Sequence, residues 1–490
     1  MNLSMVLDMA ASGDPQRPAV TGPGGDWDIG RLARGAWALA ERLRSHGASA
    51  VLYVGPNHVS YPVCLFAAAA AGVPFVPLNY RLGEGQLRSL VGSHPGALVV
   101  HDGVATVGGG VERGALLAEL GDAEGPAAPD DPELVAVLLY TSGTTAEPKA
   151  AVLRHRHLLA YVFGTVEFGG AGEDEAALVA VPPYHVAGLT NVISNVYAGR
   201  RIVYLDRFDP GEWLDAVRTH GVTQAMVVPT MLARIVEHLG DTTDAAAPTL
   251  RNLSYGGARM PVPVLERAMA LFPGVNFVNA YGLTETSSTI ALLGPDDHRA
   301  AFESQDPAVR ARLGSVGRPL PGIELEIRDE DGNPTGAGEP GLIFVRGDQV
   351  SGEYSGSTEN DSEGWFATRD RGWLDPDGYL FIEGRADDTI IRGGENIAPA
   401  EIEDVLLTHP DVADVAVVGP PDEEWGQRLV GVVVPAPGTT PDPDELRRWA
   451  RQRLRSSKTP DEIRLVAELP RTDTGKLLRR RVLEDLTAPL

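Results

Sequence analysis

The chain contains few cysteine, lysine and aromatic residues. Of its 490 residues one is a cysteine, Cys64, and 6% are aromatic. A single thiol excludes an internal disulfide framework and a cysteine-based zinc cage, and it fits a reducing compartment. The lysines are Lys149, Lys458 and Lys476, so the other 39 of the 42 basic residues are arginine. A lysine in such a composition is expected where a compact ammonium is needed and a planar guanidinium cannot replace it.

The sequence also lacks signals for secretion and for membrane insertion. Residues 1–18 contain no basic stretch followed by an apolar run and a cleavage site. The longest uncharged segment, Tyr61–Tyr80, contains three prolines and a run of alanines, which favours a buried helix leading into a strand over a membrane span. The net charge of −25 disfavours nucleic acids and anionic lipid surfaces as partners. We therefore expect a cytoplasmic protein with no membrane span and no nucleic-acid partner.

Hydrophobic residues make up 43% of the chain, and their spacing predicts an α/β protein. Residues 27–47 carry apolar side chains at helical intervals, and the dense apolar run 134–140 predicts a buried strand. Residues 103–133 are rich in Gly, Ala and acids, and predict a loop. Further elements alternate along the chain: strands at 51–55, 74–78, 177–181, 201–205, 224–228 and 276–279, and a helix at 59–71.

The texture of the sequence divides the chain into two predicted domains. From residue 314 to 384, short strands separated by Gly-, Pro- and Asp-containing turns predict a small β-rich subdomain. Residues 386–490 have helices and strands of their own and are long enough to form a separate unit, here called the lid. The sequence thus predicts a large N-terminal domain of α/β subdomains, residues 1–385, and a small, mobile α+β lid.

Charge is unevenly distributed within the lid. Residues 386–446 hold 14 acids and 2 bases, whereas residues 447–490 hold 6 acids and 12 bases. The basic segment could meet a polyanionic small molecule. On charge alone, however, a solvated helix face explains it more simply.

A polar loop, residues 140–149, follows the densest predicted strand. It reads Tyr-Thr-Ser-Gly-Thr-Thr-Ala-Glu-Pro-Lys, and backbone N–H groups, hydroxyls and an ammonium in one loop suit a triphosphate. It is not a Walker A loop, because G-x-x-x-x-G-K-[ST] occurs nowhere in the chain. Residues 336–341 fit the dinucleotide pattern G-x-G-x-x-G, but a predicted strand follows them instead of a helix, so a hairpin loop is the better interpretation.

Residues 140–149 resemble the phosphate-loop signature of the adenylate-forming superfamily, which includes acyl- and aryl-CoA synthetases, peptide-synthetase adenylation domains and beetle luciferases. More segments resemble that family's motifs in the family's order, so the chain is identified as a member over nearly its whole length. These segments are 182–188, 254–258, 279–285, 368–370, 384–388, 392–403 and 470–476.

The resemblance implies an ATP and AMP site. By this match Tyr281 stacks on adenine, Thr284 binds phosphate, and Asp370 and Arg385 bind the ribose. Glu285 would hold Mg²⁺, a hard cation that prefers oxygen ligands, and Lys149 and Lys476 would act on phosphate oxygens. The full set implied for the nucleotide is Thr141, Ser142, Gly143, Thr144, Thr145, Lys149, Gly256, Gly257, Ala258, Asn279, Ala280, Tyr281, Gly282, Thr284, Asp370, Arg385 and Lys476.

The same resemblance implies sites for the acid and for the acceptor thiol. The acid would lie against His185, Val186, Ala187, Gly188 and Gly256. The pantetheine arm of coenzyme A would pass Gly393, Gly394 and Glu395, and the lid would turn about Asp387.

The segments implied around the acid contain no charged residue except Arg259, whose direction the sequence does not give. A hydrophobic carboxylic acid is therefore expected, and benzoate-like, medium-chain and bulky terpenoid acids all stay open. The implied activity is an AMP-forming acyl-CoA synthetase that uses ATP, Mg²⁺ and coenzyme A, with His185, Glu285, Lys149 and Lys476 as its catalytic residues. The alternatives are an acyl-AMP ligase that loads a carrier protein and a nucleotide-binding pseudoenzyme.

Some positions depart from the family's pattern. Ala146, Ala150 and Arg369 stand where the family has glycine, and each demands a backbone conformation that its side chain can adopt. The segment around Lys458 matches the family only loosely, and we expect this lysine at the surface, near a phosphate of coenzyme A.

Overall fold

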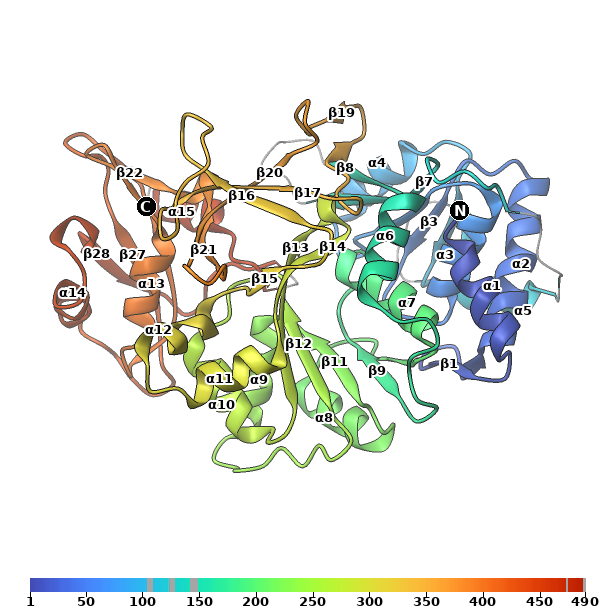
Figure 1. Cartoon of the computed structure of the whole chain (residues 1–490), viewed down its shortest axis with the longest axis horizontal. Coiled ribbons are helices and arrows are strands. Elements are labelled where there is room, and N and C mark those ends of the chain that lie inside the picture. Colours follow the sequence, from blue (N-terminus) through green and yellow to red (C-terminus); the bar gives the residue numbers. More distant parts are fainter. Residues whose placement is uncertain (104–108, 122, 124–127, 142–148, 473–474, 488–490) are drawn as a thin grey trace.

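The computed structural model describes residues 1–103, 109–121, 123, 128–141, 149–472 and 475–487. Figure 1 shows the first helices at one end of the long axis and the lid at the other. The predicted class is confirmed: mixed sheets with helices packed against them form a large N-terminal part, and a smaller C-terminal part has sheets of its own.

The first sheet is built mainly from the beginning of the chain. Its strands, in spatial order, are β19 (Ser357–Thr358), β18 (Glu353–Tyr354), β8 (Lys149–Arg154), β7 (Val135–Thr141), β4 (Phe75–Leu78), β3 (Val51–Val54), β5 (Leu98–His101) and β6 (Val111–Glu112). Parallel pairing runs from β7 to β6, and β8 turns back antiparallel to β7. β18 joins β8 from a much later part of the chain through the pair Tyr354 and Ala151.

The second sheet supplies most of the remaining motifs. Its order is β15 (Arg318–Pro319), β14 (Ser288–Leu293), β13 (Asn276–Leu283), β12 (Asn252–Gly256), β11 (Gln224–Val227), β9 (Ala176–Val179), β10 (Arg201–Tyr204), β1 (Pro18–Thr21) and β2 (Trp27–Asp28). The strands from β13 to β1 are all parallel. Their carboxyl ends therefore lie along one edge, where open α/β sheets usually bind ligands.

Helices pack against these two sheets. They are α1 (Ser4–Gly13), α2 (Ile29–Ser45), α3 (Ser60–Ala71), α4 (Glu84–Gly92), α5 (Arg113–Glu119), α6 (His155–Thr165), α7 (Val186–Ala198), α8 (Pro210–Thr219), α9 (Pro229–Leu239), α10 (Val262–Leu271), α11 (Pro295–Glu303), α12 (Pro307–Arg310), η1 (Thr284–Thr286) and η2 (Ala311–Gly314). The prediction of a loop over 103–133 is wrong in part, because β6 and α5 lie within this range. α5 buries Leu116 in the hydrophobic cluster that includes α1, α2, α3 and the strands next to them.

Helix α3 explains the uncharged run of the sequence. Its side chains are buried almost from end to end, so it has no polar face to show. Gly72 ends it with a left-handed φ of 76°, which glycine adopts without strain, and the chain then enters β4. The predicted helix leading into a strand is confirmed, and among the described residues no helix has both the length and the hydropathy that a bilayer span requires.

A separate four-stranded sheet and the lid complete the fold. The β-rich subdomain has the strand order β16 (Glu324–Arg328), β17 (Gly341–Arg346), β20 (Phe366–Leu374) and β21 (Leu380–Arg385). The G-x-G-x-x-G pattern at 336–341 is followed by β17, so the prediction that a strand follows it is confirmed. The lid contains η3 (Ala386–Asp388), β22 (Ile390–Arg392), β23 (Glu395–Ile397), α13 (Pro399–Leu407), β24 (Val412–Val418), β25 (Pro421–Asp422), β26 (Gly426–Gln427), β27 (Val430–Pro435), α14 (Pro443–Arg451), η4 (Ser456–Lys458), β28 (Glu462–Leu465) and α15 (Arg479–Thr487).

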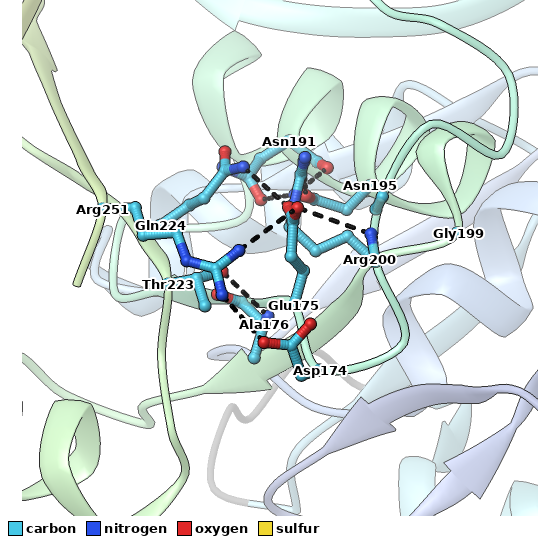
Figure 2. A network of polar contacts seen from close by, with 12 residues as sticks. Asp174, Glu175, Ala176, Asn191, Asn195, Gly199, Arg200, Thr223, Gln224 and Arg251 are labelled. Atoms are coloured by element: carbon cyan, nitrogen blue, oxygen red, sulfur yellow. Dashed lines mark hydrogen bonds and ion pairs between the residues drawn. The ribbon is translucent and has the colours of Figure 1, made fainter. Parts of the chain in front are cut away.

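A polar network braces the amino ends of the second sheet, opposite the motif-bearing edge. Figure 2 shows Glu175 among Arg200, Gln224 and Arg251. The Glu175 Oε2 atom accepts from Arg200 Nε at 2.9 Å and from Gln224 Nε2 at 3.1 Å. Arg200 also donates to Asn195 Oδ1 at 3.0 Å. Glu175, Arg200, Gln224 and Arg251 immediately precede or begin β9, β10, β11 and β12, so the network fixes the relative positions of four strands.

Candidate active site

The carboxyl ends of β12 and β13 are so close to neighbouring backbone, of β13 and β14 respectively, that only glycine fits. A Cβ added to Gly256 would lie 2.2 Å from the carbonyl oxygen of Ala280. A Cβ on Gly282 would lie 1.8 Å from the carbonyl oxygen of Ser288. The glycines of two motifs are therefore set by backbone contact, and they leave Gly257 and Ala258 exposed at the edge of the sheet.

Three side chains of separate motifs meet at the predicted ribose position. Tyr281 Oη donates to Asp370 Oδ2 at 2.6 Å, and Arg385 Nη1 donates to Asp370 Oδ1 at 3.0 Å. Asp370 and Arg385 face each other because β20 and β21 pair at these residues. A carboxylate has about four acceptor positions, so Asp370, whose side chain is 8% exposed, keeps capacity for two hydroxyl donors.

Burial and the neighbouring Asp370 carboxylate raise the pKa of Tyr281 well above its ordinary value. The phenol is therefore a neutral donor throughout the physiological range. Nearby, Asn279 is buried and donates through Nδ2 to the carbonyl oxygen of Ser315 at 3.0 Å. This bond holds the start of the 279–285 motif against the following loop.

A second cluster forms around Glu285, the predicted Mg²⁺ ligand. Glu285 lies in η1 and is 8% exposed. Its Oε1 atom accepts a hydrogen bond from Tyr354 Oη, and its backbone oxygen accepts from the N–H groups of Ser351 at 2.8 Å and Gly352 at 3.2 Å. Lys149 Nζ lies 5.8 Å from the centroid of the Tyr354 ring. Two predicted residues, Lys149 and Glu285, are thus joined by a tyrosine that the sequence motifs did not mark.

Tyr354 reaches this position because β18 pairs with β8, the strand that Lys149 begins. Burial, reinforced by the Glu285 carboxylate, raises the pKa of Tyr354 above its ordinary value, so the phenol stays protonated and donates. The available signal was a tyrosine between polar and glycine residues in a turn-rich segment. Such a segment does not reveal its pairing partner.

The residues at Glu285 fit a Mg²⁺ ion held jointly with phosphate oxygens. Mg²⁺ is usually bound by one or two carboxylates together with substrate phosphates and water, not by an all-protein cage. A buried carboxylate beside a lysine agrees with that pattern. In the described ranges no group of three or more His, Cys, Asp or Glu residues could enclose a metal alone.

Of the predicted phosphate loop, the structure describes the two ends. β7 and β8 bring Thr141 and Lys149 opposite each other in register. Four of the predicted nucleotide residues, Ser142, Gly143, Thr144 and Thr145, together with Ala146, lie outside the described residues. Thr284, the other predicted phosphate contact, is half-buried in η1 next to Glu285.

The predicted acid-binding segment lies at the start of α7. His185 is the N-cap residue of that helix, and the centroid of its ring lies 4.6 Å from that of Tyr184. Tyr184 packs edge to face against Tyr80, with 5.8 Å between centroids. Gly188 is required by close approach, since a Cβ there would lie 2.7 Å from the carbonyl oxygen of Pro182. Val186 and Ala187 are half-buried beside it.

The loop that carries Lys476 rests on the N-terminal domain. A Cβ added to Gly475 would lie 2.2 Å from Thr230 Oγ1 in α9. Asp388, in the predicted hinge region, lies close to both Lys476 and Arg385: burial raises its pKa and these cations oppose the rise. The Lys476 loop is therefore on the same side of the molecule as the ribose cluster.

The predicted pantetheine segment and hinge are on the lid. Gly393 and Gly394 are exposed, and the Gly393 N–H donates to the carbonyl oxygen of Trp425 at 2.8 Å. Glu395 Oε1 lies 3.3 Å from Arg455 Nη2. Asp387 is exposed in η3 between β21 and β22, so it stands at the passage from the β-rich subdomain to the lid.

Two ion pairs settle directions that the sequence left open. Arg259 forms an ion pair with Asp404 of α13, so its guanidinium faces the lid. Lys458 forms an ion pair with Glu401, also of α13, and only 14% of its side chain is exposed. Lys458 is therefore more enclosed than expected, and its position near a phosphate of coenzyme A stays a prediction. Its ammonium also lies close enough to Glu383 of β21 to oppose the rise in that carboxyl's pKa, which burial causes.

Arg369, which stands where the family has glycine, has a left-handed backbone conformation instead of one that suits its side chain. Its φ is 61°, a region that favours glycine over residues with a Cβ. Its guanidinium Nη2 lies 2.8 Å from Glu359 Oε2. Ala150, by contrast, is buried in β8 with an ordinary extended conformation.

Comparison with known proteins identifies the family of the chain. The family model of AMP-binding enzymes matches residues 7–355, and the model of the AMP-binding enzyme C-terminal domain matches residues 401–476. The chain belongs to this family. The predicted membership of the adenylate-forming superfamily is thereby confirmed.

Individual relatives cover nearly the whole chain. A feruloyl-CoA synthase of Amycolatopsis is 36% identical over 96% of both chains. A fatty acid–[acyl-carrier-protein] ligase of Streptomyces coeruleorubidus is 32% identical over 96% of this chain and 94% of its own length. The solved structure of o-succinylbenzoate coenzyme A synthetase of Bacillus subtilis, in complex with ATP and magnesium ion, has a TM-score of 0.84 at 29% identity, covering 98% of this chain and 99% of that one.

Proposed function

We propose that this protein is an AMP-forming acid–thiol ligase that activates a hydrophobic carboxylic acid with ATP and transfers the acyl group to coenzyme A. The observation that carries the proposal is that two clusters of polar residues meet at and just after the carboxyl end of β13. Tyr281, Asp370 and Arg385 would bind the nucleoside, and Glu285 with Lys149 would bind the phosphates. The names of the relatives, a feruloyl-CoA synthase among them, support the same reaction class.

In the first half-reaction a carboxylate oxygen attacks the α-phosphorus of ATP, the bond to the bridging oxygen breaks, and pyrophosphate leaves. Two anions must approach each other, so catalysis consists mainly of neutralising charge and aligning the reactants. Asp370 holds the ribose, Lys149 binds β- and γ-phosphate oxygens, and Lys476 binds the charge that develops on the α-phosphate. A Mg²⁺ ion on Glu285 would supply further charge neutralisation on the phosphates.

The acid is proposed to lie between α7 and the β12 edge, against His185, Val186, Ala187, Gly188 and Gly256. Arg259 is the charged residue nearest to this segment in the sequence, and its ion pair with Asp404 directs it to the lid. That supports an uncharged pocket wall and hence a hydrophobic acid. The aromatic rings of Tyr80 and Tyr184 behind His185 favour an aryl acid among the open classes.

In the second half-reaction the acceptor thiol attacks the carbonyl carbon of the acyl-AMP, the bond to the phosphate oxygen breaks, and AMP leaves. We place the exchange of catalytic groups on the lid, residues 386–490, turning about Asp387. That movement withdraws Lys476 and brings Gly393, Gly394 and Glu395 to the site, which is a gating step and not a change of chemistry.

The second candidate acceptor is a carrier protein. The similarity to a fatty acid–[acyl-carrier-protein] ligase favours it specifically. Both acceptors present a pantetheine thiol, so the same lid face would serve either one.

Pyrophosphate release with a panel of aryl, medium-chain and terpenoid acids tests the proposal. We expect release that depends on both the acid and ATP, with one acid class preferred, and acyl-CoA formation when coenzyme A is added. Turnover with a carrier protein but not with coenzyme A would establish the second candidate. Absence of acid-dependent release across the panel would contradict both.

A further inference from the structure

We propose that Arg369 is an additional phosphate-binding residue of this chain, acting on the β- and γ-phosphates of ATP. The inference deepens the proposed function and rests on it, since ATP is the ligand. It starts from a residue that is unfavourable where it stands: an arginine with a φ of 61°. Strained non-glycine residues persist where the surrounding structure holds them, and they gather at functional sites.

The position of Arg369 in the chain places it beside the nucleotide. It immediately precedes Asp370 in β20, and Asp370 is bound by Tyr281 and Arg385. Thr368 and Asp370 are buried and Arg369 between them is exposed, so Arg369 does not point with Asp370 toward Tyr281. Its guanidinium reaches instead to Glu359, at 2.8 Å.

A continuous set of hydrogen bonds connects that guanidinium to the phosphate cluster. The Glu359 N–H donates to the carbonyl oxygen of Gly352 at 2.8 Å, and the Gly352 N–H donates to the carbonyl oxygen of Glu285 at 3.2 Å. The phenol of Tyr354, two residues beyond Gly352, is bound to the Glu285 carboxylate. Through Glu359, Arg369 therefore contacts the segment 351–359, which bonds to Glu285 and carries Tyr354.

The charge of Arg369 also reaches this cluster. It lowers the pKa of the Tyr354 phenol, against the larger upward effects of burial and Glu285. Lys149 Nζ lies 5.8 Å from the centroid of the same ring. The Arg369 side chain is 51% exposed, so a polyphosphate can reach it.

An arginine is suited to this task because its planar fork binds phosphate oxygens in pairs. The simplest alternative is that Arg369 only neutralises Glu359, whose carboxylate would otherwise repel the phosphates. The two roles differ in what Glu359→Gln does. If Arg369 binds phosphate itself, Glu359→Gln frees the guanidinium of Arg369. It cannot, however, make up for the loss of that guanidinium when Arg369 is also replaced.

The test measures binding of ATP and of AMP, each with Mg²⁺ and without acid, by calorimetry on the full chain. Arg369→Gly should weaken ATP binding about tenfold, or ~1.4 kcal/mol, and leave AMP binding unchanged, because AMP lacks the β- and γ-phosphates. Arg369→Lys, which keeps the charge and loses the planar fork, should bind ATP with an affinity between those of the wild type and Arg369→Gly. Arg346→Ala, which removes a comparable arginine–glutamate pair between β17 and β16, should change neither.

The double variant Glu359→Gln with Arg369→Gly decides between the two roles. We expect it to bind ATP as weakly as Arg369→Gly alone; recovery of wild-type affinity would overturn the proposal. Equal weakening of ATP and AMP by Arg369→Gly, or no weakening of ATP, would overturn it as well. A rise in the thermal midpoint of Arg369→Gly is expected, since the strain disappears, and it shows that lost affinity is not lost folding.

The same measurements separate this proposal from the proposed function. If wild-type protein binds ATP and releases pyrophosphate with an acid while Arg369→Gly binds ATP normally, only the role of Arg369 fails. If wild-type protein binds neither ATP nor AMP, both fail.

Discussion

At the scale of single residues, the scarcity of lysine is the clearest guide to chemistry. Lys149 lies over the Tyr354 ring next to Glu285, and the loop of Lys476 rests against Thr230 on the side of the ribose cluster. Lys458 instead pairs with Glu401 within the lid. Two lysines therefore fall at the proposed phosphate contacts, and the third has a structural partner.

We predict that Lys476→Ala reduces acid-dependent exchange of pyrophosphate into ATP by at least about a hundredfold, the usual effect of losing a group that stabilises developing charge. Thioester formation from supplied acyl-AMP should be retained, because the proposed lid rotation removes this lysine before that step. Lys458→Ala is the matched control and should affect both half-reactions little. Loss of both half-reactions in Lys476→Ala would contradict the separation of roles.

A second residue-scale prediction concerns the tyrosine that the motifs did not mark. Tyr354→Phe removes the hydroxyl that donates to Glu285 and keeps the ring beside Lys149. Loss of a partner that orients a metal-binding carboxylate typically weakens the metal about 10- to 100-fold. We therefore expect the Mg²⁺ concentration for half-maximal pyrophosphate release to rise about tenfold.

The control for this variant is Tyr379→Phe, which removes a similar bond, from Tyr379 Oη to Asp297 Oδ1 at 2.6 Å, outside the proposed site. It should leave the Mg²⁺ requirement unchanged. An unchanged Mg²⁺ requirement in Tyr354→Phe would mean that the phenol does not position Glu285.

At the scale of elements, the sequence predicted what hydrophobic patterning determines and missed what pairing across the chain determines. The helix 59–71, the strand 74–78 and the parallel strands of the second sheet follow from local composition. β18 is two residues long and pairs with β8 by long-range contact, so no local signal marks Tyr354. The nucleotide motifs were predictable because glycines such as Gly256 and Gly282 are fixed by backbone approach, which leaves a recognisable pattern.

An element-scale prediction concerns the network that braces the amino ends of the second sheet. Glu175 and Arg200 are 18% and 16% exposed, so Glu175→Ala leaves a half-buried guanidinium without its carboxylate. We expect a loss of about 1–3 kcal/mol of unfolding free energy, seen as a lower denaturation midpoint, with pyrophosphate release unchanged at low temperature because the site is at the other edge.

The pH dependence of this stability has a definite sign. Burial alone would raise the pKa of Glu175, but its bonds to Arg200 hold the pKa below the ordinary value. The ionised carboxylate therefore contributes stability above the pKa of the unfolded chain, and this contribution is lost as the pH falls through the lower folded value.

The control variant for Glu175→Ala is Asp174→Ala, which removes an ion pair with Arg251 whose two side chains are both more than half exposed. It should change the free energy of unfolding by less than about 0.5 kcal/mol.

At the scale of the whole molecule, the lid is held to the N-terminal domain by specific contacts that the sequence did not reveal. Gly475 lies against Thr230, and Arg259 forms an ion pair with Asp404. Two domains could be predicted from a change of texture along the chain. Their relative placement could not, since an ion pair between distant charges leaves no pattern in an arginine-rich chain.

Asp404 makes this arrangement sensitive to pH. Partial burial raises the pKa of Asp404 to about 6; the Arg259 guanidinium opposes this rise, and the Glu403 and Glu401 carboxylates add to it. In the proposed turned arrangement, where Asp404 would be more exposed, its pKa should fall toward the ordinary value of an aspartate. As the pH falls through 6, the observed arrangement therefore takes up a proton that the turned arrangement does not, and its population should increase until the pH nears 4.

Distance measurement between fluorescent labels tests this prediction. Cys64 is buried, so cysteines introduced at the exposed Thr242 and Gln452 can be labelled selectively. We expect the fraction of molecules with the lid in the observed position to rise between pH 7 and pH 5. Asp404→Asn, which imitates the protonated acid, should hold the low-pH distribution at every pH, and Arg259→Ala should move the midpoint upward because the opposing cation is gone. Glu484→Gln, an exposed lid carboxylate on α15, is the control. A pH profile that survives in Asp404→Asn would assign the response to another group.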